Sequence, residues 1–244
     1  MKITNIARSS SMSLKGNRGS MKRIQLLVKS FTGIFFFIFI LFISAGRIDY
    51  YQGWIYSAMS LLGLLMNFSP SNVDNELLHE RSKPPKDAKE WDKHILKLSA
   101  LITIIAYVIA GLDSGRYQWS PHLQWGICIL GIVFMFSGQL LFLIAKKTNR
   151  FFSSVVRIQN DRGHTVCETG IYRFVRHPGY LGMIISWIGF PLLLGSVWSI
   201  IPIVFAIILL LVRTSLEDRT LIKELTGYSQ YIQKTRYKLV PGIW

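Results

Sequence analysis

Five long runs without Lys, Arg, Asp or Glu constrain this chain more than any other feature of its sequence. They cover residues 30–46, 50–73, 98–112, 117–145 and 178–212. A helix needs about 20 mainly apolar residues to cross a bilayer, so each run can supply most of a span. The 244 residues are also 50% hydrophobic and only 17% charged, unlike a soluble domain of this size. The sequence predicts one all-α integral membrane domain over 26–244, after a basic, disordered segment at 1–25.

The last run must turn back inside the membrane. Its 35 residues would make a helix of about 52 Å at about 1.5 Å per residue, longer than the roughly 30 Å hydrocarbon core. Pro191, Gly195 and Pro202 can break this helix, with the tip of a helical hairpin at Gly195 and Ser196. We therefore expect about six transmembrane helices, the last two forming the hairpin. The first four are expected at about 26–45, 51–67, 94–112 and 122–145.

Basic residues gather on one side of these spans. The segments 1–29, 68–93, 145–178 and 213–244 hold seven, five, seven and six Lys or Arg residues, whereas the outer loops hold only Arg47 and Arg116. The positive-inside rule then predicts a multi-pass protein with both termini in the cytoplasm. The net charge of +15 is explained by this topology and by contact with anionic lipid. No basic, aromatic-lined groove or helix-turn-helix pattern points to nucleic acid, and nothing predicts an oligomeric state.

Other polar residues receive simpler interpretations. The charged loop at 68–93 is expected to be solvated, or to cover a site with Arg81, Trp91 and Asp92. Cys128 and Cys167 imply neither a disulfide nor a metal site. Three small residues in the fourth span predict close contact with neighbouring helices: Gly126, Gly131 and Gly138. Gln139, deep in the same span, favours a hydrogen bond to another helix over a ligand contact.

The stretch GIYRFVRHPGYLG, at 170–182, places two arginines and a histidine at the edge of the last apolar run. Cations at a membrane edge are costly unless they pair or line a wet cavity, although positive-inside anchoring is an alternative explanation. Pro178 suits the first turn of the following helix, which sets His177 and Tyr180 at its mouth. This cluster is therefore a candidate site.

A second cluster follows the hairpin. Arg213 and Glu217 are four residues apart on one helical face, and Asp218 is adjacent; taken alone, they would form a surface salt bridge. Beyond them, an apolar stripe at helical spacing predicts an amphipathic cytoplasmic helix: Leu221, Leu225, Tyr228 and Ile232. Because a hairpin brings its two ends together, both clusters should meet on the cytoplasmic face. Such a group suits a polar cofactor with a cationic centre and a lipid-borne acceptor.

Three ordered motifs resemble the isoprenylcysteine carboxyl methyltransferase family. They are GIYRFVRHPGYLG, RTSLEDRTL and GYSQYIQKTRYKLVPGIW, and the resemblance covers about 150–244 closely and the upstream helices loosely. It implies a membrane methyltransferase of prokaryotic type that uses S-adenosyl-L-methionine, with the cofactor-binding part at about 150–244. The implied cofactor residues are Tyr172, Arg176, His177, Pro178, Tyr180, Gly182, Glu217, Asp218, Tyr228 and Tyr231. The resemblance also implies catalytic roles for Arg213, near the acceptor carboxylate, and for Glu217. Asp218 departs from the second glutamate that the family usually has.

The residues agree with methyl transfer at a membrane. No G-x-G-x-x-G turn of the soluble methyltransferase type follows a predicted strand. The resemblance implies transfer to the carboxylate of an isoprenylcysteine-like or other lipophilic acceptor, for which positioning and desolvation supply most of the rate. Phospholipid amine N-methylation is the main alternative. An NADPH-dependent sterol-type reductase, which typically has Asn-Tyr after His-Pro where this chain has Gly179-Tyr180, and a non-catalytic membrane scaffold are further alternatives.

Overall fold

The computed structural model describes residues 3–68, 87–121 and 124–244, with side chains from Ile24 onward within these ranges. The regular structure of these ranges is entirely helical. The α-helices are α1 (Ile3–Ala45), α2 (Tyr51–Phe68), α4 (Glu90–Ala110), α5 (Trp125–Thr148), α6 (Pro178–Leu194), α7 (Ile200–Glu224) and α8 (Tyr228–Lys234). A π-helix, η2 (Gly111–Tyr117), continues α4, and two short 3-10 helices lie between α5 and α6, namely η3 (Asn160–Arg162) and η4 (Gly170–Arg173).

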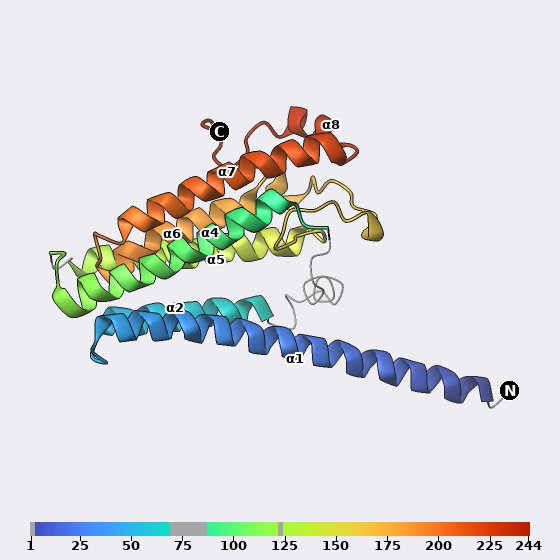
Figure 1. Cartoon of the computed structure of the whole chain (residues 1–244). Helices are drawn as coiled ribbons and strands as arrows, with labels where there is room; N and C mark the ends of the chain where they lie inside the picture. Colours follow the sequence, from blue (N-terminus) through green and yellow to red (C-terminus); the bar gives the residue numbers. More distant parts are fainter. Residues whose placement is uncertain (1–2, 69–86, 122–123) are drawn as a thin grey trace.

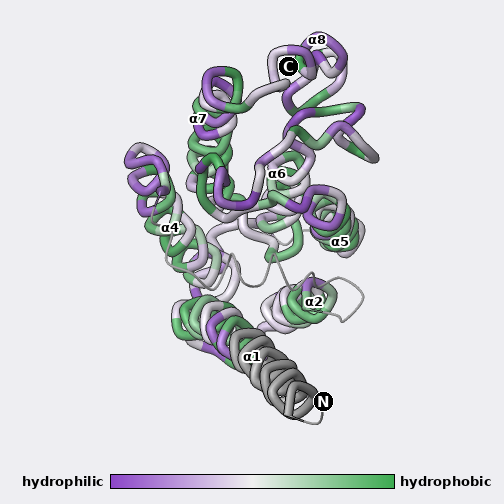
Figure 2. Tube along the Cα trace, turned by 90° about the vertical axis from the view of Figure 1, so that its right-hand side faces the viewer, coloured by the Kyte–Doolittle hydropathy of each residue, from purple (hydrophilic) through white to green (hydrophobic). Residues whose placement is uncertain are grey.

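The long helices run side by side, and the connections between them lie at the two ends of the bundle (Figure 1). Helices α1 and α2 form a pair on one side of the bundle formed by α4, α5, α6 and α7, as the end-on view also shows (Figure 2). The α1–α2, α4–α5 and α6–α7 connections lie at one end, which we call the turn end. The α5–α6 connection, the last turns of α7 and helix α8 lie at the other, which we call the site end.

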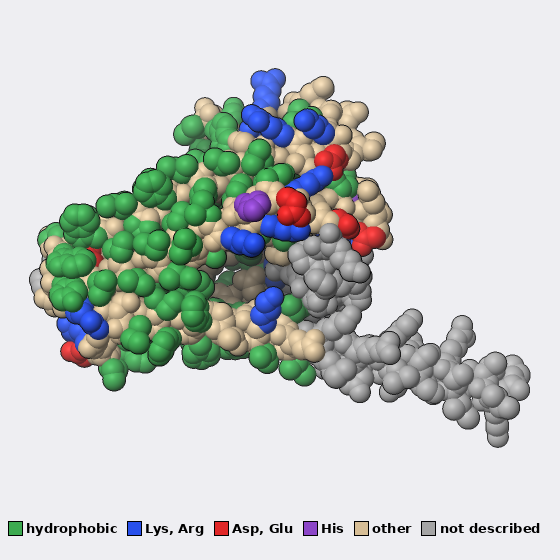
Figure 3. All heavy atoms as spheres, in the orientation of Figure 1, with side chains coloured by type: hydrophobic (Ala, Val, Ile, Leu, Met, Phe, Trp, Pro, Cys, Tyr) green, Lys and Arg blue, Asp and Glu red, His purple; other side chains and the backbone are tan. Residues whose placement is uncertain are grey.

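Four helices are long and apolar enough to cross a membrane: Ile24–Ala45, Glu90–Tyr117, Trp125–Thr148 and Ile200–Glu224. Helix α6 is a shorter apolar helix. Hydrophobic side chains cover the flank of the bundle, and most charged ones gather toward the two ends (Figure 3). Large apolar side chains such as Phe39 and Leu101 point outward and are more than half exposed. The protein is a multi-pass integral membrane protein.

Helix α1 differs from the sequence-based expectation. A disordered segment was expected over 1–25 and a helix from about 26, but the helical backbone begins at Ile3. No proline interrupts residues 3–25, so the helix of the apolar run continues backward through the basic segment. The third span also differs, because the helix continues past the expected end at Leu112 as η2.

The chain turns back at Gly195, as expected. Helix α6 ends at Leu194, and Gly195 has a φ of +69°, a left-handed conformation that glycine adopts without strain. The two prolines do not break the helices. Pro191 lies inside α6, and Pro202 lies in the first turn of α7, where a missing N–H leaves no bond unmade. The reversal therefore rests on the glycine.

Close contact between α5 and α6 depends on glycines from both helices. A Cβ on Gly138 would lie 2.4 Å from the Gly182 carbonyl oxygen, and one on Gly131 would lie 2.4 Å from the Leu193 nitrogen. The prediction for these two glycines of the fourth span is confirmed. It is wrong for Gly126, which has no atom within 4 Å of its Cβ position.

A buried aspartate joins the connections at the turn end. Asp113, in η2, is fully buried, and its Oδ1 accepts a hydrogen bond of 2.8 Å from the Ser120 N–H. Its Oδ2 accepts bonds of 2.6 Å from the hydroxyls of Ser120 and Ser196, and one of 3.2 Å from the Trp198 N–H. Asp113 therefore ties the α6–α7 connection to the α4–α5 connection.

Candidate functional site

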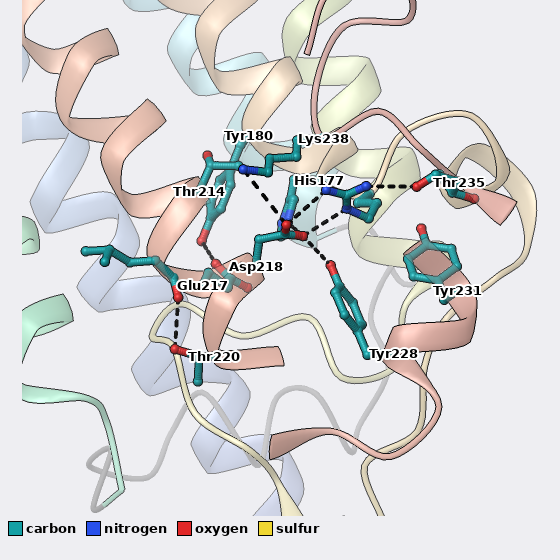
Figure 4. A network of polar contacts seen from close by, with 12 residues as sticks. His177, Tyr180, Thr214, Glu217, Asp218, Thr220, Tyr228, Tyr231, Thr235 and Lys238 are labelled. Atoms are coloured by element: carbon teal, nitrogen blue, oxygen red, sulfur yellow. Dashed lines mark hydrogen bonds and ion pairs between the residues drawn. The ribbon is translucent and has the colours of Figure 1, made fainter. Parts of the chain in front are cut away.

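The candidate site lies where the segment before α6 meets the last turns of α7 and helix α8 (Figure 4). Pro178 is the first residue of α6, as expected, and His177 directly precedes it. The hairpin returns the chain to the same end, so Glu217 and Asp218 of α7 lie beside residues 176–180. Helix α8 adds Tyr228 and Tyr231, both buried.

Asp218 is the centre of a buried polar network (Figure 4). The Arg176 guanidinium donates to both carboxylate oxygens, from Nε to Oδ1 and from Nη2 to Oδ2, each at 2.9 Å. The Tyr228 hydroxyl donates to Oδ1 at 2.8 Å, and His177 Nε2 lies 3.2 Å from the same oxygen. Burial and the Asp218 carboxylate raise the pKa of Tyr228 above its usual value, so its hydroxyl remains a donor at neutral pH.

The same arginine holds the C-terminal segment in place. Arg176 Nη1 donates to the carbonyl oxygens of Thr235, at 2.9 Å, and Arg236, at 2.7 Å. The backbone N–H groups of Arg176 and His177 donate to the carbonyls of Tyr237 and Lys238, both at 2.9 Å. The segment after α8 is therefore bonded directly to the start of α6.

Tyr180 contacts two charged side chains of α7, those of Glu217 and Arg213. Its hydroxyl donates a short hydrogen bond to Glu217, and the Arg213 guanidinium lies over its ring, 5.3 Å from the centroid. The His177 ring stacks on Tyr180, with an interplanar angle of 9°. Tyr180 is thereby fixed in one orientation, with its hydroxyl directed at the carboxylate.

Arg213 forms an ion pair that links α7 to α4. Its Nε donates to Asp92 Oδ1 at 2.7 Å and its Nη2 to Asp92 Oδ2 at 3.2 Å, and Asp92 is fully buried. Nη2 also donates to the Ser154 carbonyl, at 3.0 Å. The Val156 N–H donates to Asp92 Oδ2 at 2.8 Å, so the pair also fixes the loop between α5 and α6.

These groups surround a cavity of about 800 Å³, counted with its opening to solvent. Residues from the start of α6, from α7 and from α8 line one part of it: Tyr172, Arg176, His177, Gly179, Tyr180, Glu217, Leu221, Leu225, Tyr228 and Tyr231. The loop after α5 lines the rest, with two phenylalanines, Phe151 and Phe152, and a histidine, His164, among its residues. Among the described residues, the cavity thus has aromatic walls, one carboxylate, that of Glu217, and two guanidinium groups, those of Arg157 and Arg176.

Residues 127–223, which include α6 and nearly all of α7, match the sequence profile of the isoprenylcysteine carboxyl methyltransferase (ICMT) family. The chain is therefore similar to this family over these residues. It is 27% identical over 119 residues to a probable protein-S-isoprenylcysteine O-methyltransferase of Oryza sativa subsp. indica, covering 47% of this chain and 62% of the relative.

Two further relatives agree. A protein-S-isoprenylcysteine O-methyltransferase B of Arabidopsis thaliana is 27% identical over 134 residues, 54% of this chain and 64% of the relative. A protein-S-isoprenylcysteine O-methyltransferase of Saccharomyces cerevisiae is 34% identical over 80 residues, 32% of this chain and 34% of the relative. The chain thus spans less than two thirds of the length of these curated relatives.

The structure brings together seven of the ten cofactor residues that the ICMT resemblance implied. The seven that line the cavity are Tyr172, Arg176, His177, Tyr180, Glu217, Tyr228 and Tyr231. Pro178, Gly182 and Asp218 do not line it. Gly182 faces α5, where its Cβ position lies 2.7 Å from the Gly138 carbonyl oxygen. The Asp218 carboxylate is hydrogen-bonded to Arg176, His177 and Tyr228. It therefore connects residues that line the cavity and does not line it itself.

The expected pairing within α7 is also absent, because Asp92 takes the place of Glu217 as the ion-pair partner of Arg213. The resemblance to the ICMT family had implied that this arginine orients the acceptor. Nε and Nη2 make its hydrogen bonds, and no hydrogen bond of Nη1 occurs among the described residues. Sequence reasoning had named Asp92 only as part of a loop that covers a site, since 121 residues separate the two partners.

Sequence reasoning also missed the loop residues that line the cavity. Phe151 and Phe152 form an aromatic pair directly after a basic segment, and that was the available signal. His164 lies against the Phe151 ring, 4.6 Å between centroids, and its Nδ1 accepts a 3.3 Å hydrogen bond from the Gln159 N–H. Burial, with Arg157 and Arg162 nearby, lowers the pKa of His164 to about 4. At neutral pH its ring is therefore uncharged and carries its proton on Nε2.

Proposed function

We propose that this protein transfers a methyl group from S-adenosyl-L-methionine to the carboxylate of an isoprenylcysteine-like or other lipophilic acceptor at the cytoplasmic membrane face. The observation that carries the proposal is the cavity at the site end, most of whose lining residues lie in the segment 127–223 that matches the ICMT family. It combines Glu217, Tyr180 and the α8 tyrosines at the rim of the apolar helices, beside Arg213.

The residues fit such a cofactor. The carboxylate of Glu217 and the tyrosine rings suit a cationic ligand. When bound, S-adenosyl-L-methionine supplies a methyl group on a sulfonium sulfur, which keeps the bonding electron pair as an acceptor oxygen takes the methyl. Tyr228 and Tyr231 would enclose the cofactor, because α8 covers this part of the cavity.

Arg213 is proposed to orient the acceptor carboxylate. Its edge formed by Nε and Nη2 is held by Asp92 and Ser154, which leaves Nη1 to donate to a substrate. A guanidinium already fixed by a buried carboxylate loses little conformational freedom when it binds a second one. Glu217, the second catalytic residue in this proposal, is held by Tyr180 and would position the charged cofactor against that oxygen.

We further propose that six helices cross the bilayer and that both termini are cytoplasmic. The two short spans would be α2, with 18 residues, and α6, with 17, each about 26 Å at about 1.5 Å per residue. Helix α8 and the segment after it would lie at the membrane surface. There, Phe174 and Ile243, which are 68% and 81% exposed, would enter the bilayer interface.

The alternatives from the sequence are not favoured. The named relatives are all O-methyltransferases, so neither phospholipid amine N-methylation, nor sterol-type reduction, nor a scaffold role gains support from them. No structural observation favours any of the three. Bilayer lipid and a lipophilic acceptor therefore remain the proposed partners.

The test uses the purified full chain in lipid nanodiscs with methyl-labelled S-adenosylmethionine. We expect label transfer to a small S-farnesylated cysteine derivative. The same compound with its carboxylate blocked as an amide should take no label. Tyr180→Phe serves as a site variant, since it removes the hydrogen bond to Glu217 and keeps the ring, and it should slow turnover about tenfold. Label in the amide compound, or equal turnover by Tyr180→Phe, would contradict the proposal.

A further inference from the structure

A second cavity lies among the membrane helices, away from the site end. Its volume is about 600 Å³, counted with its opening to the outside, and it is lined from α2, α4, α5, α6 and α7. The lining residues are Tyr56, Ser60, Thr103, Ala106, Tyr107, Met135, Gln139, Ser186, Trp187, Phe190, Ile203 and Ala206. None of them lines the cavity at the site end. On α6, Ser186 lies six residues beyond Tyr180, about 9 Å deeper along the helix.

Gln139 places an unpaired hydrogen-bond acceptor at this cavity. Its Oε1 is buried without a hydrogen-bond partner, and no other side-chain nitrogen or oxygen in the described part of the chain shares that state. The sequence had favoured a hydrogen bond from this residue to a neighbouring helix. Instead the amide lies against Gly63 of α2, where a Cβ would be only 2.6 Å from Oε1. An unpaired buried oxygen is costly, so a ligand that donates to it would gain affinity.

Four of the hydroxyls that line the cavity are already hydrogen-bonded within the protein. Ser186 Oγ donates to the Met135 carbonyl at 3.3 Å, and Thr103 Oγ1 donates to the Ser99 carbonyl at 2.7 Å. The hydroxyls of Tyr56 and Tyr107 are hydrogen-bonded to each other. The cavity therefore presents the unpaired Gln139 oxygen inside walls that are largely apolar, and none of the described residues that line it is charged.

We propose that this cavity binds a lipid-soluble alcohol, whose hydroxyl donates to Gln139 Oε1 and whose chain lies among Trp187, Phe190 and Ile203. A charged ligand would find no counter-ion there, and a plain hydrocarbon would leave Oε1 unpaired. A single water molecule occupies about 30 Å³ and would leave most of the space empty. Figure 3 shows a hollow between the α1–α2 pair and the helices above it. The site is separate from the proposed methyl transfer and does not depend on it.

The experiment measures binding of tritiated dodecanol to the purified protein in nanodiscs of one defined phospholipid, by scintillation proximity and without any cofactor. We expect saturable binding. Unlabelled dodecanol should compete at least about tenfold better than dodecane at equal mole fraction in the membrane, because a hydrogen bond in a dry site separates them. Equal competition by dodecane would show that only a hydrocarbon chain is bound and would overturn the proposal. The absence of saturable binding, as expected for a cavity that holds only water, would overturn it too.

Variants assign the binding to this cavity. Gln139→Leu removes the acceptor oxygen with little change in volume and should weaken dodecanol binding about tenfold, while dodecane competition stays unchanged. Ser137→Ala is the matched control on the exposed face of the same helix and should bind within about twofold of the wild type. Unchanged dodecanol affinity in Gln139→Leu would refute the assignment. If that variant fails to fold, as checked by circular dichroism, the dodecane comparison on the wild type still decides.

Discussion

The two ends of the bundle bury aspartates against different partners. At the site end, Asp92 and Asp218 each accept two hydrogen bonds from a guanidinium, that of Arg213 and that of Arg176. At the turn end, Asp113 is as deeply buried, but the donors found in the described part of the chain are neutral hydroxyls and backbone N–H groups.

The two kinds of donor have different consequences for structure and for function. Neutral donors can hold a carboxylate and join two connections, which is a purely structural result. A guanidinium does the same and also brings further donors. Arg176 reaches the C-terminal segment through Nη1, and Arg213 lies over the ring of Tyr180, which lines the cavity. Buried ion pairs contribute little net stability but are costly to break on one side. The cation-paired end is thus the one where single substitutions should affect function and folding together.

The largest effect is expected for Arg176→Ala. The change leaves Asp218 buried without its cation and releases the carbonyls of Thr235 and Arg236, so unfolding should become easier by about 3–5 kcal/mol. Binding of S-adenosylhomocysteine, measured by isothermal titration, should be lost. Thermal unfolding in detergent gives the stability. A variant with wild-type stability would break the comparison, since Asp218 would then need no cation.

Substitutions at Arg213 can separate an effect on folding from an effect on turnover. Arg213→Ala should cost about 3 kcal/mol because Asp92 is left unpaired, and it should lower turnover. The double variant Asp92→Asn with Arg213→Gln removes both charges and should recover most of the stability. Its turnover should stay low, because no guanidinium remains to orient the acceptor. Recovery of turnover together with stability would show that Arg213 acts only through folding.

Asp113→Asn should have a smaller and purely structural effect. The amide nitrogen cannot accept the hydroxyl bonds, but the hydroxyls of Ser120 and Ser196 can rotate, so we expect a loss of about 1–2 kcal/mol. The affinity for S-adenosylhomocysteine should stay within about twofold of the wild type. A large loss of that affinity would mean that the two ends are coupled.

The smallest effect concerns pH. The pKa of His164 is lowered to about 4 in the folded protein, so the unfolded chain binds the extra proton first as the pH falls. The stabilising contribution of the neutral ring is complete above its ordinary pKa, about 6.5, and is lost as the pH falls toward about 4. The melting temperature should therefore fall more between about pH 7 and about pH 5 in the wild type than in His164→Gln. Equal falls would exclude this histidine as the cause.

Much of the site followed from the sequence because local rules determine it. The length of the last uncharged run required a reversal, and the reversal brought Arg176 and His177 to Asp218. Proline at the start of α6 set the position of His177. The apolar stripe Leu221, Leu225, Tyr228 and Ile232 was expected on one amphipathic helix. It begins in α7 and ends in α8, because the chain turns at Gly227, and Tyr228 is buried against the site.

What the sequence did not reveal depends on contacts between distant segments. The partner of Arg213 lies 121 residues away, at the start of α4, and no local spacing distinguishes Asp92 from other acidic residues. Asp218 and Gly182 carry the family motifs, yet their side-chain positions face the protein interior. The unpaired oxygen of Gln139 also depends on the exact approach of α2, which periodicity does not determine.

The bonds from Arg176 to the C-terminal segment have a consequence for biosynthesis. Residues 176 and 177 leave the ribosome before Asp218, and well before residues 235–238, whose carbonyls their backbone and side-chain donors finally meet. During that interval none of these acceptors exists, although the preceding spans can already be in the bilayer. The site is therefore assembled last, on a scaffold that is already inserted. Early truncation would leave a membrane-integrated protein with an exposed arginine and no enclosed cavity.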